Sequence, residues 1–244
     1  MTTTPTAAML VIGDEILSGR TRDSNMHFLA GELTRHNIPL CEVRVVADVA
    51  EDIVAAVQAL AGRYTYVFTS GGIGPTHDDI TADAVAAAFE TPIDVREDAR
   101  SILATHYAAR GTEMNAARLR MARIPDGAKL IDNPVSAAPG FILQNVHVMA
   151  GVPSVFQAMV ASVLPGLTGG PALLSQSVTL MMPEGELAGP LAALAGRYGE
   201  VSFGSYPFQR DGAFGAMVVA RSTDGPKLDA AMADLAETFD LAGT

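Results

Sequence analysis

Cysteine and basic residues are scarce in this sequence of 244 residues. The single cysteine, Cys41, excludes an internal disulfide. Because Cys41 comes just before the alternating run 43–46, we expect a small buried side chain rather than a reactive thiol. Lys and Arg number 16 against 27 Asp and Glu, and the net charge is -11. The sequence has no basic cluster to neutralise a row of phosphates, which excludes a nucleic-acid partner.

Long apolar runs are also missing. No stretch reaches the roughly 18 consecutive apolar residues of a membrane span. The N-terminal Met-Thr-Thr-Thr-Pro-Thr has neither the basic region nor the apolar core of a signal peptide. We therefore expect a cytoplasmic protein that does not associate with membranes. The sequence contains no Gly-x-Ser-x-Gly elbow, Walker lysine or Cys-x-x-Cys motif, and its histidines lack metal-ligand spacing.

Strand-like and helix-like patterns alternate through the first two thirds of the chain. The apolar pattern predicts strands over 7–12, 40–46, 64–69 and 129–131, and a hairpin of 141–143 with 146–149. Helical spacing predicts helices over 24–36, 51–61, 83–89, 97–107, 115–123 and 153–164. Such alternation is typical of an α/β fold with a mostly parallel sheet.

A Pro- and Gly-rich stretch over 164–171 indicates a linker. Beyond it the pattern predicts strands over 175–182, 201–206 and 215–221, a helix over 186–197 and another within 224–241. We therefore expect two domains, a ligand-binding α/β domain over 1–168 and a small α+β domain over 172–244.

A glycine-rich turn follows the predicted strand 64–69. Glycines there permit a left-handed backbone and expose N–H groups, which bind anions between a strand and a helix. Two adjacent carboxylates are more than a helix cap requires, so the turn predicts a phosphorylated ligand and a divalent metal. A tight turn with capping residues is the alternative. The candidate residues are Ser70, Gly71, Gly72, Gly74, Thr76, His77, Asp78, Asp79 and Thr81.

Two more loops carry candidate residues. Asp14 and Glu15 directly follow the first strand, and parallel strands would bring them towards Asp78 and Asp79 at one sheet edge. Oxygen ligands of this kind suit Mg²⁺ or a similar hard ion, although a solvated turn is the alternative. A loop of small residues carries Asn133, Pro134 and Gly140, which would bring it close to a ligand or to another part of the backbone.

Three motifs occur in order: Gly-Asp-Glu-Ile-Leu-Ser-Gly at 13–19, Ser-Gly-Gly-Ile-Gly-Pro-Thr-His-Asp-Asp-Ile-Thr at 70–81, and Asn-Pro-x-x-x-Ala-Pro-Gly at 133–140. Together they resemble the CinA-like family (competence/damage-inducible protein A) and the molybdopterin-binding domain of eukaryotic FAD synthetases. The resemblance covers residues 7–165, and the segment with Gly-Ser-Tyr-Pro at 204–207 is similar to the family's small second domain. It implies a MoaB/Mog-like three-layer α/β/α sandwich.

The resemblance also implies an activity. In molybdenum-cofactor relatives the glycine turn binds the pterin phosphate, and an aspartate matching Asp79 serves adenylyl transfer; Asp14 falls on an acidic residue after strand one. CinA-like proteins are linked to divalent-metal-dependent hydrolysis of ADP-ribose or FAD, with K⁺ dependence. The resemblance therefore implies a nucleotide pyrophosphatase with Asp79, Asp14 and Asp78 as catalytic residues and Asp14 and Asp79 holding Mg²⁺ or Co²⁺. A nucleotide- or pterin-binding protein without turnover is the alternative.

The sequence departs from the family pattern in two loops. Met-Ala-Gly-Val-Pro-Ser stands at 149–154, and Ser136-Ala137 replaces the usual Gly-Thr. Gly-Pro-Thr-His-Asp-Asp at 74–79, where adenylyltransferases have Gly-Phe-Thr-Pro-Arg-Asp, disfavours that activity. We expect no C-terminal deamidase domain, and from the family habit of self-association we expect a homodimer.

Overall fold

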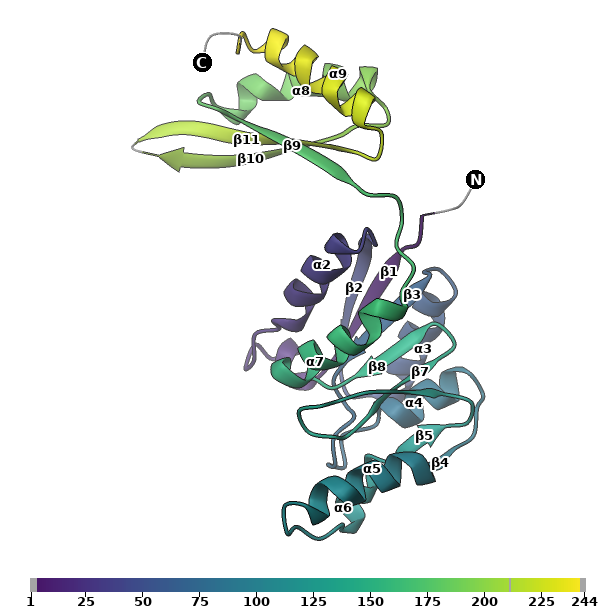
Figure 1. The fold of residues 1–244 in the computed structure, drawn as a ribbon. Coiled ribbons are helices and arrows are strands. Elements are labelled where there is room, and N and C mark those ends of the chain that lie inside the picture. Colours follow the sequence, from purple (N-terminus) through teal and green to yellow (C-terminus); the bar gives the residue numbers. More distant parts are fainter. Residues whose placement is uncertain (1–3, 211, 242–244) are drawn as a thin grey trace. The chain divides into compact units, whose positions relative to one another are not determined.

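The computed structural model describes residues 4–210 and 212–241. The chain divides into two compact units, Met1–Gly170 and Pro171–Thr244. Figure 1 shows the first in purple to green and the second in green to yellow. Among the described residues, no helix combines the length and apolar character needed to cross a membrane.

The first unit is built on a six-stranded sheet with the order β2-β1-β3-β8-β7-β6. Strand β1 runs parallel to β2 and β3, and β3 runs parallel to β8. Strand β7 is antiparallel to β8 and β6, so the sheet is mostly parallel. The strands are β1 (Ala7–Ile12), β2 (Leu40–Val46), β3 (Tyr66–Ser70), β6 (Lys129–Ile131), β7 (Gly140–Leu143) and β8 (Val146–Met149).

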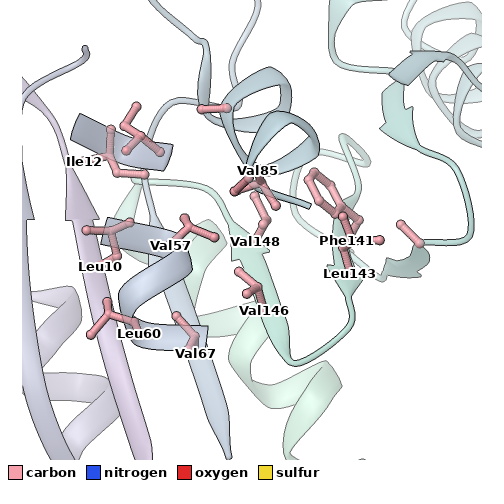
Figure 2. Packing of buried hydrophobic residues seen from close by; sticks show 14 of the residues in the cluster. Leu10, Ile12, Val57, Leu60, Val67, Val85, Phe141, Leu143, Val146 and Val148 are labelled. Carbon is pink, nitrogen blue, oxygen red and sulfur yellow. The ribbon is translucent and has the colours of Figure 1, made fainter. Parts of the chain in front are cut away.

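Helices cover both faces of this sheet, because side chains alternate along a strand. From β1, Leu10 packs into one core with α3 and α4, whereas Met9 packs into a second core with α2 and α7. Figure 2 shows part of the first core, which includes Leu10, Val57, Val85 and Val148. The three-layer α/β/α sandwich is therefore confirmed. The helices are α1 (Asp14–Leu17), α2 (Asn25–Arg35), α3 (Ala50–Ala61), α4 (Thr81–Ala88), α5 (Glu97–Ala108), α6 (Ala116–Arg120), α7 (Pro153–Val163) and the 3-10 turn Leu164–Gly166.

Two local predictions need correction. The helix expected over 115–123 ends at Arg120, because residues Arg123–Pro125 form β5 and pair with β4 (Ile93–Val95). Cys41 is exposed rather than buried. It lies on the edge strand β2, at an irregularity where Ala7 pairs with Leu40 and Ala8 with Glu42, which leaves Cys41 unpaired. The position is exposed because, in the described part of the chain, no further strand pairs with the outer edge of β2 to cover it.

The second unit has a three-stranded antiparallel sheet with the order β10-β11-β9. Helices α8 and α9 lie together on one side of it (Figure 1). Leu187 and Leu194 of α8 pack against Val218 of β11 and Leu235 of α9. The small α+β domain is therefore confirmed. Its elements are β9 (Leu174–Leu180), α8 (Glu184–Arg197), β10 (Ser202–Arg210), β11 (Ala213–Ser222) and α9 (Gly225–Thr238).

Candidate functional site

A cavity of about 530 Å³ lies at the carboxyl ends of the parallel strands in the first unit. Its walls come from the loops that follow β1, β2, β3, β6 and β8. This is the edge at which parallel sheets bind ligands, because the connecting loops leave a crevice there. Carboxylates of four residues line the cavity, namely Glu15, Asp48, Asp78 and Asp79.

The glycine turn after β3 forms one wall, and only glycine fits at two of its positions. Gly71 and Gly72 have φ angles of 111° and 67°. A Cβ atom on Gly71 would lie 2.1 Å from the Ile12 carbonyl oxygen, and one on Gly72 would lie 2.1 Å from Thr81 Oγ1. The buried Thr81 hydroxyl donates to the Gly71 carbonyl at 3.0 Å. Thr81 therefore shapes the turn from below and does not line the cavity.

Asp79 braces the second half of the turn. Its Oδ2 accepts hydrogen bonds from the Thr76 backbone N–H at 2.7 Å and from the Thr76 hydroxyl. Gly74 is needed here, since a Cβ at that position would approach the same Oδ2 to 2.7 Å. Gly74, Asp78 and Asp79 line the cavity, while Thr76 and the fully exposed His77 do not.

The loops after β1 and β2 place their carboxylates differently from the sequence prediction. Asp14 is exposed and outside the cavity wall, whereas its neighbour Glu15 lines the cavity. The Asp14 backbone N–H donates to Oδ2 of Asp48 at 3.0 Å. The sequence reasoning missed Asp48, although an available signal was its position two residues after a strand whose end lies at the same sheet edge.

The electrostatics of the cavity distinguish two of its carboxylates. Partial burial raises the pKa of Asp48, and the negative charges of Asp14, Glu15 and Asp78 raise it further. Hydrogen bonding by Thr76 and by the backbone lowers the pKa of Asp78. The environments of these two carboxyl groups therefore shift their pKa values in opposite directions, a pattern seen in acid–base sites.

Asn133 and Gly140 shape the wall that follows β6. Asn133 is buried, and its Nδ2 donates to Ser136 Oγ at 2.7 Å and to the Ala138 carbonyl at 2.8 Å. Its Oδ1 accepts from two backbone N–H groups, so this side chain organises the loop while lining the cavity. Pro134 lies outside the lining. Gly140 is in β7, where a Cβ would lie 2.3 Å from the Val148 carbonyl oxygen, so it permits close strand pairing.

Ser70 is buried and does not line the cavity. Its Oγ accepts a hydrogen bond from Asn25 Nδ2 at 2.8 Å, and the same Nδ2 donates to the Gly151 carbonyl at 2.8 Å. Asn25 thus ties the end of β3 to the loop after β8, a link that the sequence analysis did not foresee. Gly151 belongs to that loop, and a Cβ there would lie 3.2 Å from the Gly71 Cα atom.

The charges in the cavity wall have one sign, since the residues that line it include no Lys, Arg or His. In the described part of the chain, no three Asp, Glu, His or Cys side chains converge closely enough to form a complete metal cage. A hard cation held by one or two carboxylates, with phosphate and water completing its shell, requires no such cage. The residues present therefore fit a divalent cation that binds together with an anionic ligand.

A family model, described as the probable molybdopterin binding domain, matches residues 8–169 of the sequence, about two thirds of the chain. The chain belongs to this family. A second model, the middle domain of FAD synthase, matches residues 172–243. The resemblances to the CinA-like family and to the FAD synthetases, which the sequence motifs indicated, are confirmed by these models and by the relatives below.

Curated relatives and a solved structure agree with this membership. The chain is 33% identical to a CinA-like protein of Myxococcus xanthus, over 80% of this chain and 50% of the relative. It is 30% identical to a probable FAD synthase of Caenorhabditis elegans, over 95% of this chain and 49% of that protein. The chain therefore spans about half the length of these relatives. The chain is also similar to the protein CinA from Thermoplasma acidophilum, whose crystal structure is known. The sequence identity is 30% and the TM-score 0.62, and the match covers 67% of this chain and 99% of that one.

Proposed function

We propose that this protein is a metal-dependent nucleotide pyrophosphatase that hydrolyses ADP-ribose, FAD or a related dinucleotide. The observation that carries the proposal is one cavity lined both by the glycine turn and by four carboxylate residues, two of which follow the turn directly. The turn offers backbone N–H groups to a phosphate, while the carboxylates repel it. A divalent cation between the carboxylates and the diphosphate resolves this conflict. The CinA-like and FAD synthase relatives make a dinucleotide the ligand class that we favour.

The proposed roles follow from where each side chain lies. Asp79 and Asp48 face the cavity and hold the metal, with Glu15 beside them. Asp14, which the sequence motif suggested as a ligand, instead positions Asp48 through its backbone N–H. Asp78, with its lowered pKa, is ionised at neutral pH and serves as a third carboxylate or as a base. When bound, the metal polarises a phosphoryl oxygen and lowers the pKa of a water molecule.

Substitution of Asp79 by Asn tests this proposal. The amide oxygen can still accept from the Thr76 N–H, so the turn should keep its shape, while the charge that holds the metal is lost. We expect release of AMP from ADP-ribose or FAD with Mg²⁺ or Co²⁺ to fall by at least about 100-fold. The assay is run with and without K⁺. Asp52→Asn is the control, because Asp52 is exposed in the first turn of α3 and lies outside the cavity wall. Undiminished hydrolysis by the Asp79 variant would contradict its role.

A binding protein without turnover is the second candidate. It is favoured by the incomplete metal cage among the described residues and by the engagement of Asp79 with Thr76. Calorimetry with ADP-ribose, FAD and a pterin phosphate separates the two candidates. Tight binding with no AMP from any dinucleotide would favour the binding protein. The homodimer remains a prediction, and sedimentation equilibrium of the full chain tests it.

A further inference from the structure

A smaller recess adjoins the acidic cavity at the glycine turn. The walls of both include Gly72, Ile73, Gly74, Asp79 and Met121. Two arginines, Arg120 and Arg123, also line the recess, whereas none lines the main cavity. Two basic side chains therefore lie beside the cavity that holds the carboxylates, and not in its wall.

The two arginines differ in how they are used. Arg123 pairs with Asp83, which links β5 to the first turn of α4 and raises the pKa of this guanidinium. Arg120 ends α6 and is exposed, and among the described residues it forms no ion pair. Its Nη2 donates to the backbone carbonyl of Asp79 at 3.3 Å. That contact holds the guanidinium at the glycine turn, with donor groups left over for a ligand.

We propose that Arg120 forms an anion subsite that binds a non-bridging phosphate oxygen of the dinucleotide, a role that rests on the proposed function. A planar guanidinium presents paired N–H donors that match phosphate geometry. The diphosphate would lie between the carboxylates, which hold it through the cation, and Arg120, which contacts it directly. The negative charge of the diphosphate would then be neutralised from two sides, by the cation and by Arg120. The described residues that line the acidic cavity supply no positive charge of their own.

Arg118 supplies a matched control on the same short helix. Its guanidinium stacks over the Tyr107 ring at 4.8 Å from the centroid and donates to the Glu113 carbonyl. It lines neither the acidic cavity nor the recess. Removing Arg118 therefore takes away the same charge from α6 without touching the proposed subsite.

The test is calorimetric binding to the full chain in Mg²⁺ of adenosine and of the non-hydrolysable α,β-methylene analogue of ADP-ribose, which stands in for ADP-ribose because the wild type would cleave that ligand. Wild type, Arg120→Ala, Arg120→Lys and Arg118→Ala are compared. We expect Arg120→Ala to weaken binding of the analogue by at least about tenfold, because charged hydrogen bonds to phosphate are lost. Adenosine, which has no phosphate, should bind all four proteins alike. Arg120→Lys should recover part of the affinity, and Arg118→Ala should match wild type. The salt dependence of binding should become shallower only in Arg120→Ala.

The outcomes separate the two proposals. Equal affinities of wild type and Arg120→Ala for the analogue would overturn the subsite and leave the proposed function intact. An equal loss in Arg118→Ala would also overturn the subsite, since the effect would then be one of net charge. A wild type that binds neither the analogue nor FAD would overturn both. Thermal melting of each variant shows that a loss of affinity does not come from unfolding.

Discussion

The first unit runs β2, β1, β3 and β8 in parallel, whereas all three strands of the second unit are antiparallel. Parallel strands need crossover connections, so the loops after their carboxyl ends gather at one edge of the sheet. In the first unit this edge brings together four carboxylates and a glycine turn. Antiparallel strands place successive loops at opposite ends of the sheet, which disperses such groups.

The cavities of the two units reflect this difference. The second unit has a cavity of about 570 Å³ between α8 and β10, lined mostly by small and apolar residues with one carboxylate, Glu184. Its volume is similar to that of the acidic cavity, but its lining has one carboxylate where the acidic cavity has four. Volume alone therefore does not identify a reactive site, and the convergence of polar groups does.

The largest effect on stability that we expect comes from Gly71→Ala, a substitution in the loop that follows β3 of the first unit. The new Cβ would clash with the Ile12 carbonyl oxygen, which lies 2.1 Å from its ideal position, and the residue would have to keep a positive φ. We expect a loss of about 3 kcal/mol or more in the free energy of unfolding of this unit, measured by urea denaturation. Gly111→Ala is the control: its φ is also positive, at 61°, but its surroundings are open. It should cost only about 1 kcal/mol, and an equal cost at both sites would show that the close contact is not decisive.

A smaller effect of opposite sign is expected from Gly196→Ala in α8 of the second unit. Apart from its chain neighbours and the backbone of its own helix, no atom lies within 4 Å of the Cβ that would be added. Alanine should stabilise the second unit by roughly 0.5–1 kcal/mol, because it loses less backbone entropy in a helix. Gly31→Ala in α2 meets nothing closer than the end of Arg35 at 3.9 Å and should behave alike. Destabilisation by either alanine would contradict a purely entropic role for these glycines.

The smallest effects should come from one aspartate in each unit, with opposite signs. Burial and neighbouring negative charges raise the pKa of Asp48, so its ionised form destabilises the fold as pH rises through that pKa. Asp48→Asn should therefore raise the free energy of unfolding at pH 7 by a few tenths of a kcal/mol in metal-free buffer, measured as a higher urea midpoint. In the second unit, hydrogen bonds from Tyr198 and Arg197 lower the pKa of Asp234. Asp234→Asn should lower the midpoint at pH 7.

Both aspartate effects should fade as the pH falls. Asp48 becomes protonated first, which removes the repulsion that the Asn variant relieves. Asp234 loses its stabilising contribution when the pH falls through its lowered pKa, below the ordinary value near 3.9. Urea midpoints measured from pH 7 to pH 3 check both trends. Equal signs at pH 7 would refute the contrast between a repulsive cluster and a paired carboxylate.

Much of the fold was readable from local pattern. Strand β1 was predicted with its observed bounds, since a parallel strand buried on both faces is a continuous apolar run. The hairpin of β7 and β8 was also predicted, and Gln144 adopts the left-handed φ of 52° in its turn. Helix α1 was missed, because four residues are too few to show a period. The exposure of Cys41 was missed because the position of β2 at the sheet edge depends on strand order.

The sequence by itself determined the glycine turn, its two aspartates and the family, because these lie in contiguous residues whose chemistry is local. Only the tertiary structure decided that Glu15 and Asp48 line the cavity while Asp14 does not. It also decided that Asn25 ties β3 to the Gly151 loop and that Arg120 reaches the Asp79 carbonyl. These partners lie 34 to 126 residues apart in the chain, and a distance of that kind is set by strand order and crossover geometry rather than by local pattern.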